Sequence, residues 1–314
     1  MEQVGTPWLW GGFTLFVLFM LSLDLGVFHR RAHVVSWKEA VSWSAVWIGL
    51  AAVFCGGLYV FFGADKALEF AAGFVIEKAL AIDNIFVFMI IFRAFAIPAT
   101  EQHRVLFWGV LGALLMRAAF IFAGAAVITR FHWAMYGFGA LLVFTGLRLM
   151  FQRDQNDDDP QNSAALRFFT RVMPATTEFD GDSFTLVKDG KRYATPLLLA
   201  LFVIEVSDLI FAVDSIPAIF AVTTDRFLVF TSNIFAIMGL RSLYFLLAGV
   251  IDKFIYLKLA LSFVLLFVGA KMLIVDFYHM PILVSLGAII GILTISILAS
   301  IWKQRALAGR SQSS

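Results

Sequence analysis

The sequence has 314 residues, of which 61% are hydrophobic and only 15% are charged. A soluble domain is nearer half apolar and a quarter charged, so this composition excludes an ordinary water-soluble protein and predicts a polytopic membrane protein. The formal net charge of +2 gives no indication of a nucleic-acid partner. The single cysteine, Cys55, lies in an apolar run, which predicts neither a disulfide framework nor a thiolate metal site.

Apolar runs long enough to cross about 30 Å of hydrocarbon recur along the whole chain. They predict an all-α protein with about nine transmembrane helices, and no enzymatic activity is expected. The first run is too long for the apolar core of a signal peptide and is expected to be retained. The predicted spans are 8–28, 42–62, 67–92, 104–128, 132–151, 195–222, 227–251, 256–275 and 281–302.

The basic residues are distributed unevenly between alternate connections. Of the 24 Lys and Arg residues, 17 lie in one set of connections, three in the other, and four within predicted spans. The positive-inside rule assigns the richer set to the cytoplasm. The amino terminus is therefore expected outside and the carboxy terminus inside.

One connection, 152–194, is long and polar, and we interpret it as a cytoplasmic linker with a small ordered flap. Its segment 186–194 (LVKDGKRYA) predicts a hairpin that turns at Asp189-Gly190. The acidic run at 157–159 leaves a regulatory or metal-sensing role open, although such runs are usually only solvated.

Parts of the sequence on either side of this linker resemble each other. FVIEKALAIDNI at 74–85 resembles FVIEVSDLIFAVDSI at 202–216, and the following helices match around Arg117 and Arg241. A third pair of helices matches as FTGLRLM and FVGAKML. Repeat 1 is therefore predicted over 67–151 and repeat 2 over 195–275, in one transport domain that comprises the whole chain, 1–314.

Each predicted repeat contains three helices, which is an odd number. The two repeats must then cross the membrane in opposite directions, as the loop charges independently indicate. Inverted repeats are typical of secondary transporters, whose binding site lies near the bilayer midplane where the repeats meet.

Six carboxylates lie within predicted spans, where each would cost about 2.5–3.5 kcal/mol at the centre of a lipid-facing helix. They are Asp24, Glu77, Asp83, Glu205, Asp208 and Asp214. The four basic residues within spans, Lys78, Arg117, Arg241 and Lys271, could balance at most four of these charges. We expect Arg117 and Arg241 to hold carboxylates in position when no metal is bound. The remaining acids predict a cation site.

The donors near these acids are oxygens. Asn84 follows Asp83 and Ser215 follows Asp214, at matching positions of the two repeats. Oxygen-rich sites favour Mg²⁺, Ca²⁺ or Mn²⁺ over Zn²⁺ or Cu²⁺. A divalent ion that binds there would displace protons from the carboxylates, which is the chemistry of cation/proton exchange. Pro217 further predicts a kinked or unwound helix near 212–217, with free carbonyls as additional ligands.

These motifs resemble the TerC family of integral membrane proteins. The similarity extends over nearly the whole chain and is strongest in EKALAIDN (77–84) and EVSDLIFAVDSIPAIFAVTTD (205–225). It continues through 231–250 and 271–282 and is greatest for the Alx-type branch of the family. The resemblance implies a multi-pass protein of the bacterial inner membrane that exports Mn²⁺, carries no resident cofactor and uses the intramembrane acids as its metal site.

Three alternatives compete with manganese export. The chain could export another hard divalent cation such as Ca²⁺, because these ions accept the same ligands. It could be a membrane scaffold of a metal or tellurite stress-response complex that recruits proteins through its linker. An intramembrane aspartyl protease is disfavoured because neither Asp83 nor Asp214 follows the glycines of a G-x-G-D pattern. The oligomeric state is not predicted.

Overall fold

The computed structural model describes residues 4–28, 36–131, 133–151, 163–188, 190–248, 256–278 and 280–311. Within these ranges, the side chains at 24–28, 83, 129, 164–165, 257 and 305–311 are not described. Almost all of the described chain is helical. The helices are α1 (Pro7–Phe28), α2 (Trp37–Phe62), α3 (Ala64–Ala94), α4 (Ala99–Arg130), α5 (Ala134–Phe151), α6 (Ala164–Val172), α7 (Pro196–Phe220), α8 (Arg226–Met238), α9 (Leu240–Leu247), α10 (Leu257–Leu273) and α11 (Ile282–Ser311), and the strands are β1 (Thr185–Lys188) and β2 (Lys191–Ala194).

Helices cover every predicted span, but not all of them are long and apolar enough to cross a bilayer by themselves. Among the described residues, α2, α4, α5, α7 and α11 have the required length and apolar composition, and α8 with α9 forms a sixth candidate. Helix α3 is interrupted by charged residues, α10 has 17 residues, and the part of α1 with described side chains ends at Leu23. The fold is thus that of a polytopic all-α membrane protein with five or six candidate spans among the described residues, and the number of nine spans stays a prediction.

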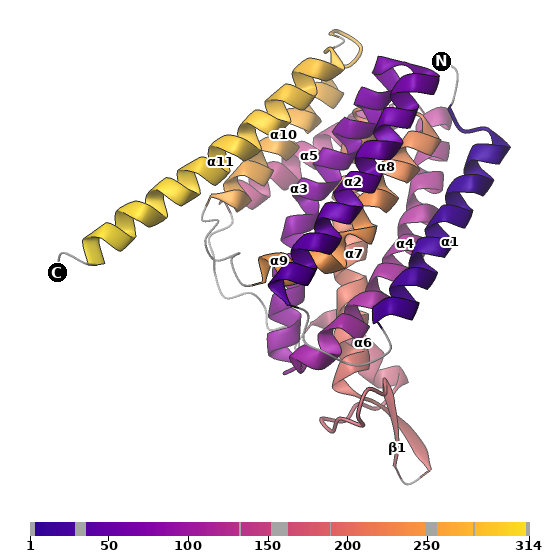
Figure 1. Ribbon diagram of the computed structural model, residues 1–314, viewed down its shortest axis with the longest axis vertical. Helices are drawn as coiled ribbons and strands as arrows, with labels where there is room; N and C mark the ends of the chain where they lie inside the picture. The colour runs from indigo at the N-terminus through magenta and orange to yellow at the C-terminus, as the bar shows by residue number, and fades with distance from the viewer. Residues whose placement is uncertain are drawn as a thin grey trace.

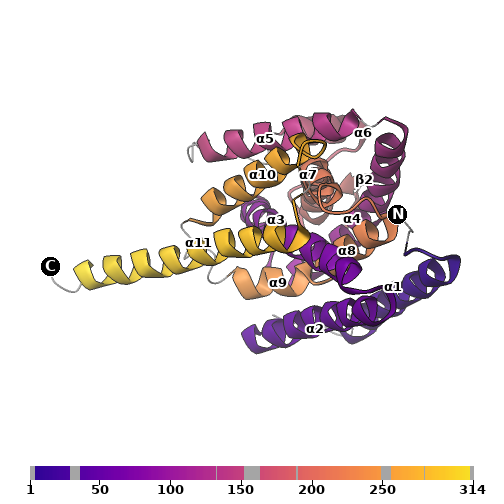
Figure 2. The same cartoon turned by 90° about the horizontal axis from the view of Figure 1, so that it is seen from above.

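The long helices run roughly side by side, and α3, α4, α7 and α8 form the middle of the bundle (Figures 1 and 2). Helices α3 and α4 each contact both α7 and α8. Figure 2 shows α1 and α2 along one side of this group and α5 with α10 along the opposite side, while α11 extends away from the bundle. The centre of the bundle is therefore built from α3, α4, α7 and α8.

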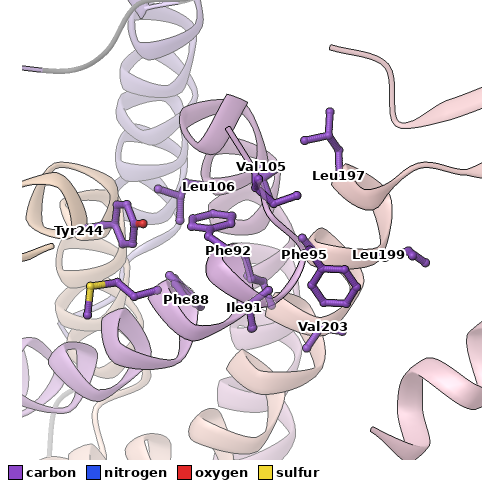
Figure 3. Packing of buried hydrophobic residues seen from close by; sticks show 14 of the residues in the cluster. Phe88, Ile91, Phe92, Phe95, Val105, Leu106, Leu197, Leu199, Val203 and Tyr244 are labelled. Carbon is purple, nitrogen blue, oxygen red and sulfur yellow. The ribbon is translucent and has the colours of Figure 1, made fainter. Parts of the chain in front are cut away.

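Apolar side chains fill the end of the bundle where α3 passes into α4. Phe88, Phe92 and Phe95 from α3 pack there with residues of α4, the start of α7 and Tyr244 of α9 (Figure 3). Aromatic rings join the helices on the α1–α2 side: Phe13 lies 5.6 Å from Phe235 of α8, measured between ring centroids. Close packing on both sides fixes how α3, α7 and α8 face one another.

Small residues let α5 and α10 approach closely. A Cβ atom added at Gly269 of α10 would lie 2.9 Å from the carbonyl oxygen of Gly139 and 2.9 Å from the backbone nitrogen of Val143, both on α5. Both neighbours are backbone atoms, so relief requires the two helices to separate. Glycine is needed at position 269 because of this contact between helices.

Gly269→Ala is expected to lower the free energy of unfolding by about 1–3 kcal/mol, the usual cost of overpacking. Gly287→Ala in α11 is the matched control, because a Cβ there meets nothing within 4 Å. Alanine has the higher helix propensity, so the control should be neutral or slightly stabilised. Thermal unfolding of the detergent-solubilised protein measures both changes, and equal shifts for the two variants would contradict the assigned contact.

The structure corrects the expectation of an unwound helix near Pro217. Helix α7 continues as an α-helix through 212–217 and ends three residues after Pro217, although this proline cannot donate to the carbonyl of Val213. The break lies instead in the predicted span 227–251, where α8 and α9 meet at Gly239 with a bend of 41°. A Cβ at Gly239 would lie 2.6 Å from the Nζ atom of Lys78, so a larger residue here would require the lysine side chain to move.

The linker has the small ordered flap that the sequence predicts. Strands β1 and β2 pair antiparallel with Thr185 opposite Ala194, and Gly190 in the turn has a φ of 73°, which suits glycine. Asp189 and the acidic run at 157–159 lie outside the described residues. The flap is fastened to the bundle, because Arg104 of α4 forms an ion pair with Asp182 and the backbone nitrogen of Thr195 donates to the carbonyl of Phe184 at 3.1 Å.

Candidate functional site

A buried arginine joins two carboxylates in the middle of the bundle. Arg117 of α4 binds Asp208 of α7 with two parallel hydrogen bonds, Nε to Oδ2 at 3.0 Å and Nη2 to Oδ1 at 2.8 Å. Its Nη1 also pairs with Oε1 of Glu77 on α3. The exposed fractions of these three side chains are only 1–2%. Arg117 thus contacts two of the predicted intramembrane carboxylates, and its role as their holder when no metal is bound stays a prediction.

Helical periodicity explains why the partners share one face. Glu77 and Asn84 are seven residues apart on α3, and Asp208 and Ser215 are seven apart on α7. Seven residues make almost two complete turns, so each pair lies along one stripe of its helix. Asn84 donates through Nδ2 to Oδ1 of Asp208 at 3.2 Å, and Nη1 of Arg117 lies 3.4 Å from Oγ of Ser215. Residues from the two segments that resemble each other in sequence therefore meet at one arginine.

A cavity of about 80 Å³ adjoins this cluster. It is large enough for several water molecules or for a cation that has lost part of its hydration shell. Asp214, half-buried, faces it from α7, and its Oδ1 accepts a hydrogen bond from Oγ1 of Thr145 on α5 at 3.0 Å. The polar residues that line the cavity are Glu77, Asn84, Arg117, Thr145, Asp214 and Ser215.

Two oxygens of the cluster are left with unused capacity. Oε2 of Glu77 and Oδ1 of Asn84 are buried and have no hydrogen-bond partner among the described residues. Buried polar atoms are normally satisfied, so such atoms in a polar cavity indicate a place for water or an ion. Across the described side chains no three His, Cys, Asp or Glu residues lie close enough together to hold a metal ion. A cation here would need the amide and hydroxyl oxygens, or a movement of Arg117.

The other predicted acids lie apart from this cavity or are not described. The Glu205 carboxylate packs against the backbone of α4, where a Cβ at Gly112 would lie 2.0 Å from its Oε1. Asp24 and Asp83 lie on α1 and α3, but their side chains are outside the described set. The structure thus joins Glu77 and Asp208 at Arg117 and places Asp214 on the adjoining cavity, while the placement of the Asp24 and Asp83 side chains stays a prediction.

The remaining basic residues differ from Arg117. Lys78 donates to the carbonyl of Ala236 at 2.9 Å, near the end of α8 where cations are favoured. Arg241 borders another small cavity, with Trp47 of α2 among its lining residues. The ion pairs of the described residues do not include Lys271. Among the described side chains, Arg117 thus pairs with two of the predicted intramembrane acids, whereas Lys78 pairs with a backbone carbonyl.

Sequence reasoning missed Thr145, which binds Asp214 and lines the cavity. A lone threonine in an apolar helix is not distinctive. The available signal was its position beside Gly146, within the third pair of repeated helices.

Comparisons with known proteins agree with this architecture. Residues 62–308 match the model of the integral membrane protein TerC family. A Myxococcus xanthus protein named "Uncharacterized membrane protein STKORF319" is 57% identical over 303 residues, covering 96% of this chain and 95% of the relative. A Rickettsia bellii membrane protein is 40% identical over 294 residues, covering 93% and 96%.

A relative in Escherichia coli K12 has a functional name, "Putative membrane-bound redox modulator Alx". It is 46% identical over 311 residues, covering 96% of this chain and 97% of the relative. No solved structure matches the chain. Because the family match extends over most of the sequence, this multi-pass chain belongs to the TerC family of integral membrane proteins.

Proposed function

We propose that the protein exports Mn²⁺ from the cytoplasm through the cavity beside Arg117, in exchange for protons. The observation that carries the proposal is the buried group of Glu77, Asp208 and Arg117 next to a cavity that Asp214 also lines. Acids at this depth are expensive unless they bind a cation or line a pathway. Their position between α3 and α7 corresponds to the place where repeats meet in secondary transporters.

The donors favour a hard divalent cation. Carboxylate, amide and hydroxyl oxygens line the cavity, and Oε2 of Glu77 and Oδ1 of Asn84 are available. Such ligands suit Mn²⁺, Mg²⁺ and Ca²⁺ alike. The choice of Mn²⁺ rests on the family resemblance.

Arg117 gives a physical reason for a two-state cycle. In this structure the guanidinium pairs with both Glu77 and Asp208, so its single positive charge offsets one of their two negative charges without a metal. An entering cation would bind the Glu77 carboxylate in place of Nη1 of Arg117, and this nitrogen would be released. When the cation leaves, protons or the guanidinium would restore the charge balance, because a bare buried carboxylate pair is unfavourable.

The helix contacts support an inverted-repeat mechanism. Helix α3 contacts α8 and α4 contacts α7, and these two contacts exchange if repeat 1 and repeat 2 change places. The contacts α3–α7 and α5–α10 each join a helix to its counterpart. Rocking of one repeat against the other would open the cavity to alternate sides. The loop charges favour an outside amino terminus and an inside carboxy terminus.

The redox role in the name of the Alx relatives does not transfer easily to this sequence. It contains one cysteine, Cys55, so it cannot form a disulfide within the chain. The sulfur of Cys55 lies on α2 and contacts the carbonyl oxygen of Ala67 at 3.4 Å. We therefore base the proposal on ion transport.

The test is transport by the purified protein in liposomes that contain a divalent-ion dye and, separately, a pH dye. Mn²⁺ entry should exceed that of protein-free liposomes several-fold, should accelerate when the lumen is more acidic than the outside, and should make the lumen more alkaline. Ca²⁺ and Mg²⁺ are compared in the same assay, and entry of either in place of Mn²⁺ would reassign the substrate. If no divalent cation enters at either pH, the transport proposal is wrong and the scaffold hypothesis gains support.

A further inference from the structure

Helix α6 of the linker has three chemically different sides. Leu166 is 6% exposed and faces the bundle together with Phe169. Phe168 and Val172, four residues apart, are 67% and 75% exposed. At 100° per residue they form an apolar edge beside the inward face.

The remaining side of α6 is basic. Arg167 and Arg171 are also four residues apart, and both are exposed. A short helix with one apolar edge and one basic edge is typical of segments that lie in the plane of a membrane interface. Contact with a membrane surface explains why the apolar side chains of Phe168 and Val172 are exposed, whereas contact with water alone does not.

The depth of α6 can be obtained from its contact with α7. The ring of Phe169 lies 4.6 Å from the ring of Phe202, between centroids. Helix α7 has 25 residues and is therefore about 38 Å long, whereas the hydrocarbon layer is about 30 Å thick. Phe202 comes six residues after the start of α7, or about 9 Å, so it lies within the hydrocarbon wherever the layer is placed along an upright α7. Helix α6 must then lie at the hydrocarbon boundary.

Figure 1 agrees with this placement. Helix α6 lies at the end of the bundle near the start of α7, and the β1–β2 hairpin projects beyond it. The ordered flap therefore has two levels, a helix at the membrane boundary and a hairpin farther from the bilayer.

We propose that α6 is a membrane-surface helix that binds anionic phospholipid. Phe168 and Val172 insert among the acyl chains next to the headgroups, and Arg167 and Arg171 bind the headgroup phosphates. A bilayer is favoured over a protein partner because the contact with Phe202 sets α6 at the lipid boundary, where apolar and cationic side chains find complementary partners in one molecule. The inference is independent of which ion, if any, the protein moves.

Spin labels measure the predicted depth directly. In a Cys55→Ala background, single cysteines are introduced as Phe168→Cys and Val172→Cys, and the labelled full-length protein is placed in nanodiscs. Thr170→Cys, on the opposite side of α6, and Val187→Cys, in the hairpin and 63% exposed, are the matched controls. Labels at 168 and 172 should be several-fold more accessible to oxygen than to a water-soluble nickel complex, and the two controls should show the reverse.

The lipid requirement is tested with nanodiscs of phosphatidylcholine alone and with about one third phosphatidylglycerol. The label at 172 should lie deeper with the anionic lipid, and Arg167→Gln with Arg171→Gln should remove that difference. Aqueous accessibility at 168 and 172 equal to that at 187 would overturn the proposal. Protection from both reagents, persisting in detergent, would also overturn it because a protein surface would then cover α6. A depth independent of phosphatidylglycerol would refute the headgroup contact.

Discussion

Asp214→Asn is expected to reduce Mn²⁺ transport by about 100-fold or more while leaving the fold intact. Removal of an outer partner of a metal site already costs 10–100-fold in affinity, and a direct carboxylate ligand should cost at least as much. Asp214 is half-buried and forms no ion pair within the described part of the chain, so asparagine removes charge without leaving a buried cation unpaired. Its amide oxygen can still accept the hydrogen bond from Thr145.

Thr145→Val separates the charge of Asp214 from its orientation. Valine keeps the shape of threonine but removes the hydroxyl, so Asp214 loses a hydrogen bond worth about 1 kcal/mol and keeps its charge. Uptake rates in liposomes over a range of Mn²⁺ concentrations, with thermal unfolding of the same samples, measure both variants. Thr145→Val is expected to lower the rate of Mn²⁺ uptake by up to about 10-fold. If Asp214→Asn transports Mn²⁺ at the wild-type rate, Asp214 is not part of the ion site.

The helices were predictable because a long apolar run has few alternatives in a membrane. The pairing at Arg117 was also anticipated, because an arginine recurs in matching helices among acids that need a counter-charge. Even the shared face of Glu77 and Asn84 follows from their spacing of seven residues. These features depend on local periodicity and on charge, both of which can be read along the chain.

The bend at Gly239 and the role of Lys78 were not predictable. Glycines are common in membrane helices, so Gly239 gave no more indication of a break than several others. Only the packing of α3 against α8 shows that Lys78 lies next to this glycine and reaches the carbonyl of Ala236. Thr145 was missed for the same reason, since α5 must lie against α7 before its hydroxyl has a partner. Pro217 misled because a proline can remove one hydrogen bond, here that to the carbonyl of Val213, without unwinding the helix around it.

Arg117→Gln is expected to destabilise the protein by about 3–5 kcal/mol, the usual effect of removing one partner from a buried ion pair. The substitution leaves Glu77 and Asp208, 1% and 2% exposed, without their cation. Combining Arg117→Gln with Glu77→Gln and Asp208→Asn should restore most of the lost stability, because the neutral site contains no unpaired charge. Thermal unfolding in detergent compares the single and triple variants with the native protein.

Mn²⁺ distinguishes a structural arginine from one that occupies the place of a transported cation. If a metal takes over the carboxylates that Arg117 now holds, Mn²⁺ should raise the unfolding temperature of Arg117→Gln more than that of the native protein, since binding to the folded state alone stabilises it by mass action. The triple variant should show no such response because it lacks both carboxylates. Equal shifts in all three proteins would mean that Mn²⁺ binds elsewhere, and Glu77 and Asp208 would then have only a structural role. A larger shift in the single variant would identify the guanidinium and the metal as competitors for the same two acids, which is the relation that the proposed exchange cycle requires.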